Sequence, residues 1–175
     1  MQLRQGLILV LALAAGTAYA ASEKVTMHKV TADGIQESVG TVTISETEYG
    51  LVFAPQLTSL PAGIHGFHVH EKGSCDAAEK DGKATAAAAA GGHYDPEQTD
   101  KHLGPYQKGH LGDLPALYVT EDGQADYPVL APRLQKIEQI KGRALMLHAG
   151  SDNHSDTPEA LGGGGARMAC GVISE

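Results

Sequence analysis

The 175-residue chain has no tryptophan, only 5% aromatic residues and only two cysteines. Basic residues are also scarce: 13 Lys and Arg stand against 21 Asp and Glu, which gives a formal net charge of −8. Without a basic cluster, the chain is a poor candidate for binding nucleic acid or an anionic membrane. No apolar run approaches the roughly 20 residues that span a bilayer. We therefore expect a soluble mature protein without membrane insertion.

Glycine and proline are abundant by contrast, with 22 and 8 residues. They follow no period, which excludes a collagen-like chain, and the 42% of apolar residues argues against simple disorder. So much glycine and proline also disfavours a helical bundle. The length fits one compact domain. The nine histidines are the least ordinary part of the composition and indicate a site that uses imidazole.

The first twenty residues have the three parts of a secretory signal peptide. Arg4 gives a positive start, residues 6–16 form a short apolar run, and Ala18-Tyr19-Ala20 is a small-x-small cleavage site. We predict a signal peptide over residues 1–20, cleaved after Ala20, and one mature domain over residues 21–175. Loss of Arg4 leaves 12 Lys and Arg against 21 Asp and Glu, a mature charge of −9.

Export changes the interpretation of Cys75 and Cys170. In an oxidising compartment an even pair more often forms a disulfide than a metal or redox site, and neither cysteine lies in a Cys-x-x-Cys motif. The loop closed by such a bond is long, so a chain-entropy model assigns it about 4 to 5 kcal/mol of stability.

Period-two patterns predict an all-β domain. Val42 and Ile44 alternate with polar neighbours, and residues 121–123 (Glu-Asp-Gly) form a hairpin-turn signal. Seven or eight short strands separated by turn signals are typical of an antiparallel sandwich or barrel. The predicted strands cover residues 24–30, 39–45, 51–53, 64–70, 116–120, 125–130, 144–148 and 168–173.

Two long stretches, residues 73–114 and 149–167, interrupt this pattern. Both are rich in glycine, and loops of such length in a compact domain are usually functional. We interpret residues 86–90 as part of the first loop. Residues 132–141 have apolar residues at helical spacing, which predicts a short helical or turn-like segment on the surface.

His68 and His70 lie two residues apart in a predicted strand, so their side chains share one face. We expect Phe67 and Val69 to point into the core and the two imidazoles to point outward, as half of a metal site. Taken alone, a His-x-His pattern is a weak signal that more often marks two surface histidines than a metal site.

Further ligand types follow at short intervals: His93, His102, His110 and Asp113, and then His148 at the end of a predicted strand. Histidine nitrogens and a carboxylate are the donors that hold Zn²⁺ in proteins. In the predicted strand Met146 and His148 point outward. Seven ligands exceed the need of one tetrahedral ion, which favours two adjacent metals that share one ligand.

The chain resembles the copper,zinc superoxide dismutases, and their exported bacterial branch in particular. Four motifs carry the resemblance in the order and spacing of that family, over nearly the whole mature chain: residues 66–70, 92–93, 109–114 and 162–172. The resemblance implies a flattened antiparallel Greek-key β-barrel of about eight strands with two long functional loops.

The resemblance also implies ligand roles, with one copper and one zinc per subunit. His93 would bridge the two ions. The implied copper ligands are His68, His70, His93 and His148, and the implied zinc ligands are His93, His102, His110 and Asp113.

Four further residues match landmarks of the family. Arg167 resembles the arginine beside the copper channel, and Asp152 resembles the aspartate that hydrogen-bonds both a copper and a zinc histidine, here His68 and His102. Such outer carboxylates fix the tautomer and orientation of the rings. Cys75 and Cys170 resemble the family disulfide, which would anchor the loop near Arg167.

The implied reaction converts two superoxide radicals into dioxygen and hydrogen peroxide. One superoxide reduces Cu²⁺, and a second reoxidises Cu⁺ and takes up protons. His93, released when copper is reduced, would accept a proton and pass it on, while zinc has no redox chemistry. Arg167 would attract and orient the anion. The resemblance further implies a periplasmic enzyme that protects the cell envelope. It allows a monomer or a homodimer, and residues 102–110 favour the homodimer.

Other residues receive structural or open interpretations. We expect His65 to make structural hydrogen bonds, His28 to lie on a strand without ligand neighbours, and His154 to be solvated, although it could approach the channel. Lys72, Lys80 and Lys83 fit an exposed face, and a role in steering the substrate stays open. A copper-buffering protein would need neither Arg167 nor a shared His93. A zinc hydrolase would need an open zinc position with a general base.

Overall fold

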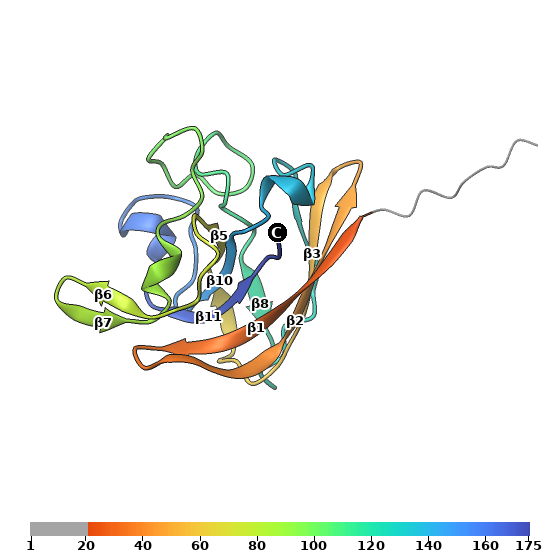
Figure 1. Cartoon of the computed structure of the whole chain (residues 1–175). Helices are drawn as coiled ribbons and strands as arrows, with labels where there is room; N and C mark the ends of the chain where they lie inside the picture. The colour runs from red at the N-terminus through yellow and green to blue at the C-terminus, as the bar shows by residue number, and fades with distance from the viewer. Residues whose placement is uncertain (1–20) are drawn as a thin grey trace, which may run out of the picture.

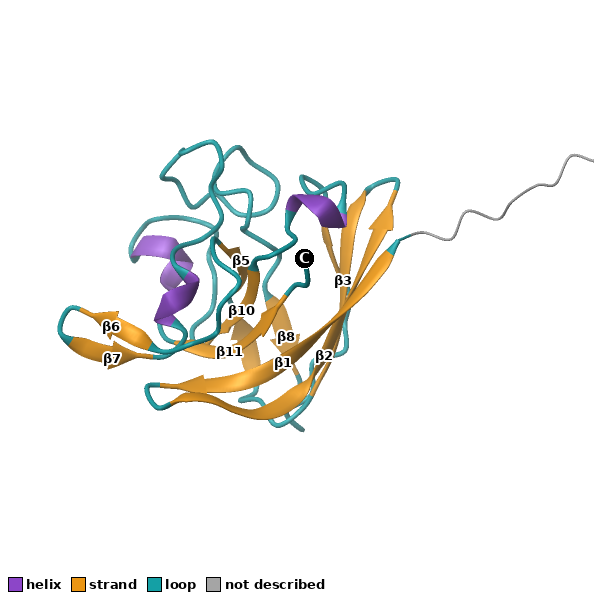
Figure 2. Cartoon of the chain, in the orientation of Figure 1, coloured by secondary structure: helices purple, strands orange, loops and turns teal. Residues whose placement is uncertain are grey.

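The computed structural model describes residues 21–175, so the predicted signal peptide lies outside the described residues. The described part is nearly all β, with three short 3₁₀ helices (Figures 1 and 2). A seven-stranded antiparallel sheet curls into a half-barrel, which confirms the predicted fold class. Its strands, in spatial order, are β5 (Phe67–His70), β10 (Ala144–His148), β11 (Arg167–Val172), β1 (Ser22–Thr31), β2 (Gly34–Thr47), β3 (Gly50–Leu57) and β9 (Val129–Ala131).

Two strand pairs and the 3₁₀ helices complete the fold. The pair β4 (Gly63–His65) and β8 (Leu117–Val119) is antiparallel, and so is the hairpin of β6 (Ala78–Lys80) and β7 (Lys83–Thr85). Figure 1 shows this hairpin projecting from the body of the domain. The 3₁₀ helices are η1 (Ala88–Ala90), η2 (Ile137–Gln139) and η3 (Ala160–Gly163). Among the described residues, no helix is both long and apolar enough to cross a membrane.

The long strands follow the predicted alternation. Val25 and Met27 of β1 face the core with Val42 and Ile44 of β2, and polar residues between them face outward. The turn into β3 needs a glycine at position 50. Its φ is +129°, and a Cβ there would lie 2.5 Å from the carbonyl oxygen of Ala131. This close approach sets β9 beside β3.

Both faces of β10 are buried, contrary to our expectation for its outer face. Leu145 and Leu147 pack in the main core, whereas Met146 packs in a second apolar cluster under the first long loop. Cys75 and Cys170 lie in that second cluster and form a disulfide, which confirms the predicted pairing. The disulfide ties the loop to β11.

The predicted strand 64–70 is in fact two strands. At Gly66 the chain leaves β8 and bonds to the end of β10: its N–H donates to Gly150 O, and its carbonyl accepts from the N–H of His148. β4 therefore pairs with β8, whereas β5 pairs with β10. This division turns His68 and His70 toward His148.

Four other local predictions were incomplete or wrong. Of the predicted strand 125–130, only the part from Val129 onward pairs with a neighbouring strand. Ala125 makes an isolated β-bridge to Leu57. The hairpin β6–β7 lies inside the first predicted loop, and η1 falls within residues 86–90. Residues 132–141 do contain a short 3₁₀ helix at the surface, as predicted, with exposed polar side chains, but the segment also contributes to the core. Their apolar side chains are buried in the main core: Leu134, Ile137 and Ile140.

Candidate metal centre

The site is built on β5, at the edge of the seven-stranded sheet. His68 and His70 point to one face while Phe67 and Val69 point to the core, as predicted. They are not surface histidines, because only 0% and 1% of their area is exposed. The loop of residues 92–113, distant in sequence, covers them.

Backbone hydrogen bonds fix this loop along the free edge of β5. The N–H of Tyr94 donates to Val69 O, that of Val69 donates to Gly112 O, and that of Gly112 donates to Tyr94 O, each at 2.8 Å. A Cβ at Gly112 would lie 2.2 Å from Val69 O, so this approach requires glycine. The pairing places His93 and Asp113 beside the strand.

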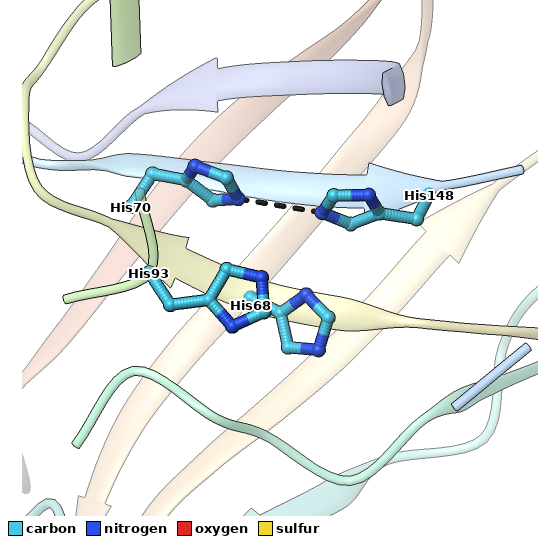
Figure 3. Close-up of side chains that lie close together, drawn as sticks. All are labelled: His68, His70, His93 and His148. Atoms are coloured by element: carbon cyan, nitrogen blue, oxygen red, sulfur yellow. Dashed lines mark hydrogen bonds between the residues drawn. The ribbon is translucent and has the colours of Figure 1, made fainter. Parts of the chain in front are cut away.

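Four histidines converge in the first group of possible metal ligands: His68, His70, His93 and His148. One nitrogen from each ring lies within 4.8 Å of the others. Nε2 of His70 and Nε2 of His148 are 3.3 Å apart (Figure 3), and the rings of His68 and His93 stack at 3.9 Å. Four imidazoles form a donor set that suits copper.

Asp113 organises the second group. Its Oδ1 lies 2.9 Å from His93 Nδ1 and 3.4 Å from His110 Nδ1, and its Oδ2 lies 3.0 Å from His102 Nδ1. Four residues of this region each offer one donor atom within 4.8 Å of the others: His68, His93, His102 and Asp113. His110 lies outside that set and contacts it at Asp113. Nitrogen and oxygen donors of this kind suit zinc.

Asp152 joins the two groups. Its buried carboxylate places Oδ2 2.8 Å from His68 Nε2 and Oδ1 2.7 Å from His102 Nε2. Such a carboxylate accepts a hydrogen bond from the Nε2–H of each ring. The opposite nitrogen, Nδ1 in both rings, then presents its lone pair to the cluster.

Backbone carbonyls orient the other two rings of the first group. Nδ1 of His70 lies 3.0 Å from Gly91 O, and Nδ1 of His148 lies 3.2 Å from Gly165 O. Each Nδ1–H can donate to its carbonyl, which leaves the lone pair on Nε2. All these rings thus direct a free lone pair inward.

Several of these inward atoms make no well-oriented hydrogen bond within the described chain, although His102 Nδ1 and Asp113 Oδ2 lie only 3.0 Å apart. They are His68 Nδ1, His102 Nδ1, His110 Nδ1 and Asp113 Oδ2, four of the six such buried side-chain atoms. An unsatisfied buried polar group costs about 1–3 kcal/mol, so a protein rarely gathers four of them. Bound metal ions would satisfy all four, and the residues therefore fit a two-metal centre.

The four histidines of the first group are in the protonation state that favours metal binding. Burial lowers the pKa of His148 to about 4 and moves the pKa values of His68 and His70 well below the usual range. Burial also lowers the pKa of His93. These imidazoles are neutral at neutral pH and can bind a metal without first losing a proton.

The second group is charged. Burial opposes the charge of His102, but the carboxylates of Asp113 and Asp152 beside its two ring nitrogens outweigh it and raise the pKa of His102 to about 9 in the metal-free protein. Metal binding at Nδ1 therefore releases one proton. Burial likewise opposes ionisation of the two carboxyls, yet the histidine contacts lower the pKa of both. Two ionised carboxylates in this place favour a divalent cation.

Arg167, at the start of β11, lies beside the first group. Its guanidinium donates to the carbonyls of Ala87, at 2.5 Å, and Gly91, and its Nη2 lies 3.5 Å from His70 Nδ1. Burial lowers its pKa. A pocket of about 420 Å³ opens here, lined among others by Arg167, His70, His93, His148, Lys80 and Leu161.

Three histidines lie outside both ligand groups. His65 makes structural hydrogen bonds, as predicted: Nδ1 lies 2.9 Å from His148 O and Nε2 lies 2.9 Å from Pro61 O. No sequence signal indicated that His65 holds the strand end that carries His148. His28 contacts Gln36 O on β2, away from the site. His154, expected to be solvated, is partly buried against Gly104.

Known proteins resemble this chain over most of its length. The family model for copper/zinc superoxide dismutase matches residues 38–173. Superoxide dismutase (Cu-Zn) 2 of Salmonella typhimurium is 59% identical over 170 residues, 97% of this chain and 98% of that protein. Superoxide dismutase (Cu-Zn) of Escherichia coli K12 is 60% identical over 166 residues, 95% of each chain.

Two solved structures share the fold. The Cu/Zn superoxide dismutase from Brucella abortus has a TM-score of 0.87 and 54% identity, and covers 88% of this chain and 100% of its own. The monomeric copper, zinc enzyme from Salmonella enterica has a TM-score of 0.80 and 60% identity, with the same coverage. With the histidine cluster able to bind metal, these likenesses show an oxidoreductase that acts on superoxide with copper and zinc as cofactors. The chain belongs to the copper/zinc superoxide dismutase family.

Proposed function

We propose a division of the site between its two metals. Copper is held by the four-histidine group: His68, His70, His93 and His148. Zinc is held by the carboxylate group: His93, His102, His110 and Asp113. The single observation that carries this division is the position of His93, whose Nδ1 contacts Asp113 while its ring stacks on His68. His93 is therefore the residue able to serve both ions.

Bound copper supplies one-electron chemistry and bound zinc supplies charge without redox chemistry. Over a full turnover, two superoxide radicals and two protons become one dioxygen and one hydrogen peroxide. The chain's own task is to admit the anion, orient it and deliver protons. His93 lines the pocket, and its Nε2 is the nitrogen not engaged with Asp113. We assign Nε2 of His93 as the atom that holds a proton and donates it to the reduced substrate.

Arg167 is the residue that orients superoxide. Its guanidinium lies at the pocket wall beside His70, and the two carbonyls that it contacts fix its position. A mature charge of −9 repels an anion at long range, but the approach rate depends on the local field at the pocket. A fixed cation there offsets that repulsion where the anion enters.

Lys80 contributes to the same local field. It lines the pocket from β6, whereas Lys72 and Lys83 do not contribute to its wall. Glu79 also lines the pocket and partly cancels the charge of Lys80. Of the three lysines, we therefore assign a steering role to Lys80 alone, smaller than that of Arg167.

The enzyme works in the periplasm, where it protects the cell envelope from superoxide. Support comes from the signal-peptide pattern of residues 1–20 and from the disulfide, which persists in oxidising compartments. Cleavage after Ala20 leaves the domain of residues 21–175, whose first strand begins at Ser22.

The homodimer predicted through residues 102–110 stays a prediction. Tyr106 is the large exposed hydrophobic residue of that segment, at 68% exposure, whereas the similar enzyme from Salmonella enterica is titled monomeric. Sedimentation of the mature protein at micromolar concentration distinguishes the two states: a species of twice the chain mass supports the homodimer, and a species of one chain mass contradicts it.

Metal analysis tests the proposed division. We expect purified mature protein, reconstituted with zinc and then copper, to hold one of each ion and to dismutate superoxide. His102→Ala should abolish the zinc but leave copper binding, whereas His70→Ala should do the reverse. Loss of the same ion from both variants would contradict the division.

A further inference from the structure

The carboxylate of Asp156 links two loops that no strand joins. Its Oδ2 accepts a hydrogen bond from the backbone N–H of His102 at 2.9 Å. Its Oδ1 accepts one from the backbone N–H of Leu161 at 3.2 Å. His102 belongs to the second ligand group, and Leu161 lines the substrate pocket.

Leu161 needs such a restraint. Its φ is +54°, a left-handed conformation that a leucine adopts only when its surroundings hold it there. Its side chain is 40% exposed, so core packing does not supply the whole restraint. The hydrogen bond to Asp156 fixes the backbone at this strained residue, and with it one wall of the pocket.

His102 is held at two places by two different carboxylates. Asp152 contacts its ring and continues to His68, within the metal cluster. Asp156 contacts its backbone and continues to Leu161, outside the cluster. The second connection leads from the backbone of the ligand loop to the backbone of Leu161, whereas the ring of His102 and the carboxylate of Asp152 only pack against the neighbouring Gly162.

We propose that Asp156 is a positioning residue that couples the zinc ligand His102 to the wall of the superoxide pocket at Leu161. The proposal rests on the assignment of His102 to zinc. When zinc fixes His102, Asp156 is held in turn and keeps Leu161 in place. Without zinc, the ligand loop and the pocket wall loosen together.

Amide hydrogen exchange on the mature protein reads this coupling directly. In the wild type, removing zinc should speed exchange at Leu161 roughly tenfold, as expected for the loss of a hydrogen bond to a charged group. In Asp156→Ala, exchange at Leu161 should be fast with or without zinc. Asp156→Asn keeps one acceptor oxygen and should give an intermediate rate. Asp122→Ala, a change at an exposed aspartate in a surface turn, is the matched control.

Zinc release gives a second readout, and a core amide separates it from a folding defect. With a chelator in excess, Asp156→Ala should release zinc roughly tenfold faster than wild type, the lower end of the effect of outer partners of metal ligands. Slow exchange at the core amide of Val25 shows that the variant is folded.

The outcomes separate this proposal from the assignment beneath it. If His102→Ala retains zinc, the assignment of His102 is wrong. Two results would show that the coupling through Asp156 is wrong even if His102→Ala loses zinc. One is an exchange rate at Leu161 of the wild type that is the same with and without zinc. The other is an Asp156→Ala variant that behaves like Asp122→Ala.

Discussion

Asp113 and His93 are twenty positions apart in the chain, yet Asp113 Oδ1 lies 2.9 Å from His93 Nδ1. This contact commits one nitrogen of His93 to the carboxylate group and leaves the other for the histidine group. Because both side chains are almost fully buried, their geometry depends on the backbone pairing that brings the loop against β5.

The backbone pairing itself can be tested at Gly112. A Cβ there meets Val69 O at 2.2 Å, so Gly112→Ala must separate the loop from β5. We expect a loss of about 2 kcal/mol or more in the free energy of unfolding, with reduced metal content. Gly92→Ala is the matched control in the same loop, since its Cβ would meet nothing closer than 3.7 Å. Urea denaturation and metal analysis should separate the two variants, and equal behaviour would contradict the account.

Removal of Asp152 should weaken both metals at once. The carboxylate sets the tautomers of His68 and His102, so Asp152→Ala should lower metal affinity about 10- to 100-fold. Competition against a chelator measures this. The exposed Asp126→Ala should leave the affinity unchanged. An unchanged affinity in Asp152→Ala would show that the rings are oriented without it.

Replacement of Arg167 should change turnover and not metal binding. Arg167→Ala removes the cation at the pocket and should lower kcat/KM roughly tenfold or more, with a flatter dependence on ionic strength. Arg167→Lys keeps the charge but not the two-carbonyl geometry, so it should retain the salt dependence at a reduced rate. Full activity and an unaltered salt slope in Arg167→Ala would sink the orienting role.

The metal-free protein should respond to pH through His102 and His148 with opposite signs. The folded pKa of His102, about 9, exceeds its unfolded value near 6.5, so its stabilisation is complete below pH 6.5 and disappears as pH rises through 9. The folded pKa of His148, about 4, is depressed, so its contribution is present above pH 6.5 and declines as pH falls toward 4.

Urea denaturation of the metal-free protein at several pH values tests these signs. The wild type should lose stability on both sides of pH 6.5. The stability difference between wild type and His102→Gln, at most about 3 kcal/mol, should shrink between pH 6.5 and 9. A difference that grows with pH over this interval would contradict the assignment.

Much of the fold could be read from local pattern. Alternation identified β2, short strand-like runs identified β1 and β10, and the histidines and Asp113 were recognisable by residue type and spacing. The division at Gly66 was not, because it depends on bonds to Gly150 and His148, some eighty residues away. A continuous strand-like segment gives no local sign of such a change of partner.

Burial at the site was equally invisible in the sequence. Alternation placed His68 on the side away from the core, but that side is closed by a distant loop. The same reason explains Met146, which packs beneath the loop held by the disulfide, and Ile137, which turns into the core from a segment expected at the surface. Alternation within a strand indicates which side chains face the core, but not whether a distant loop covers the other face.

The central claim is that one side chain, His93, binds both ions. Its most direct test is the electron paramagnetic resonance spectrum of copper in protein with paramagnetic cobalt in the zinc position. A shared imidazole couples the two ions magnetically, so we expect the copper signal of the wild type to be strongly diminished. It should return when diamagnetic zinc replaces cobalt. A full, uncoupled copper signal beside bound cobalt would contradict the shared role of His93.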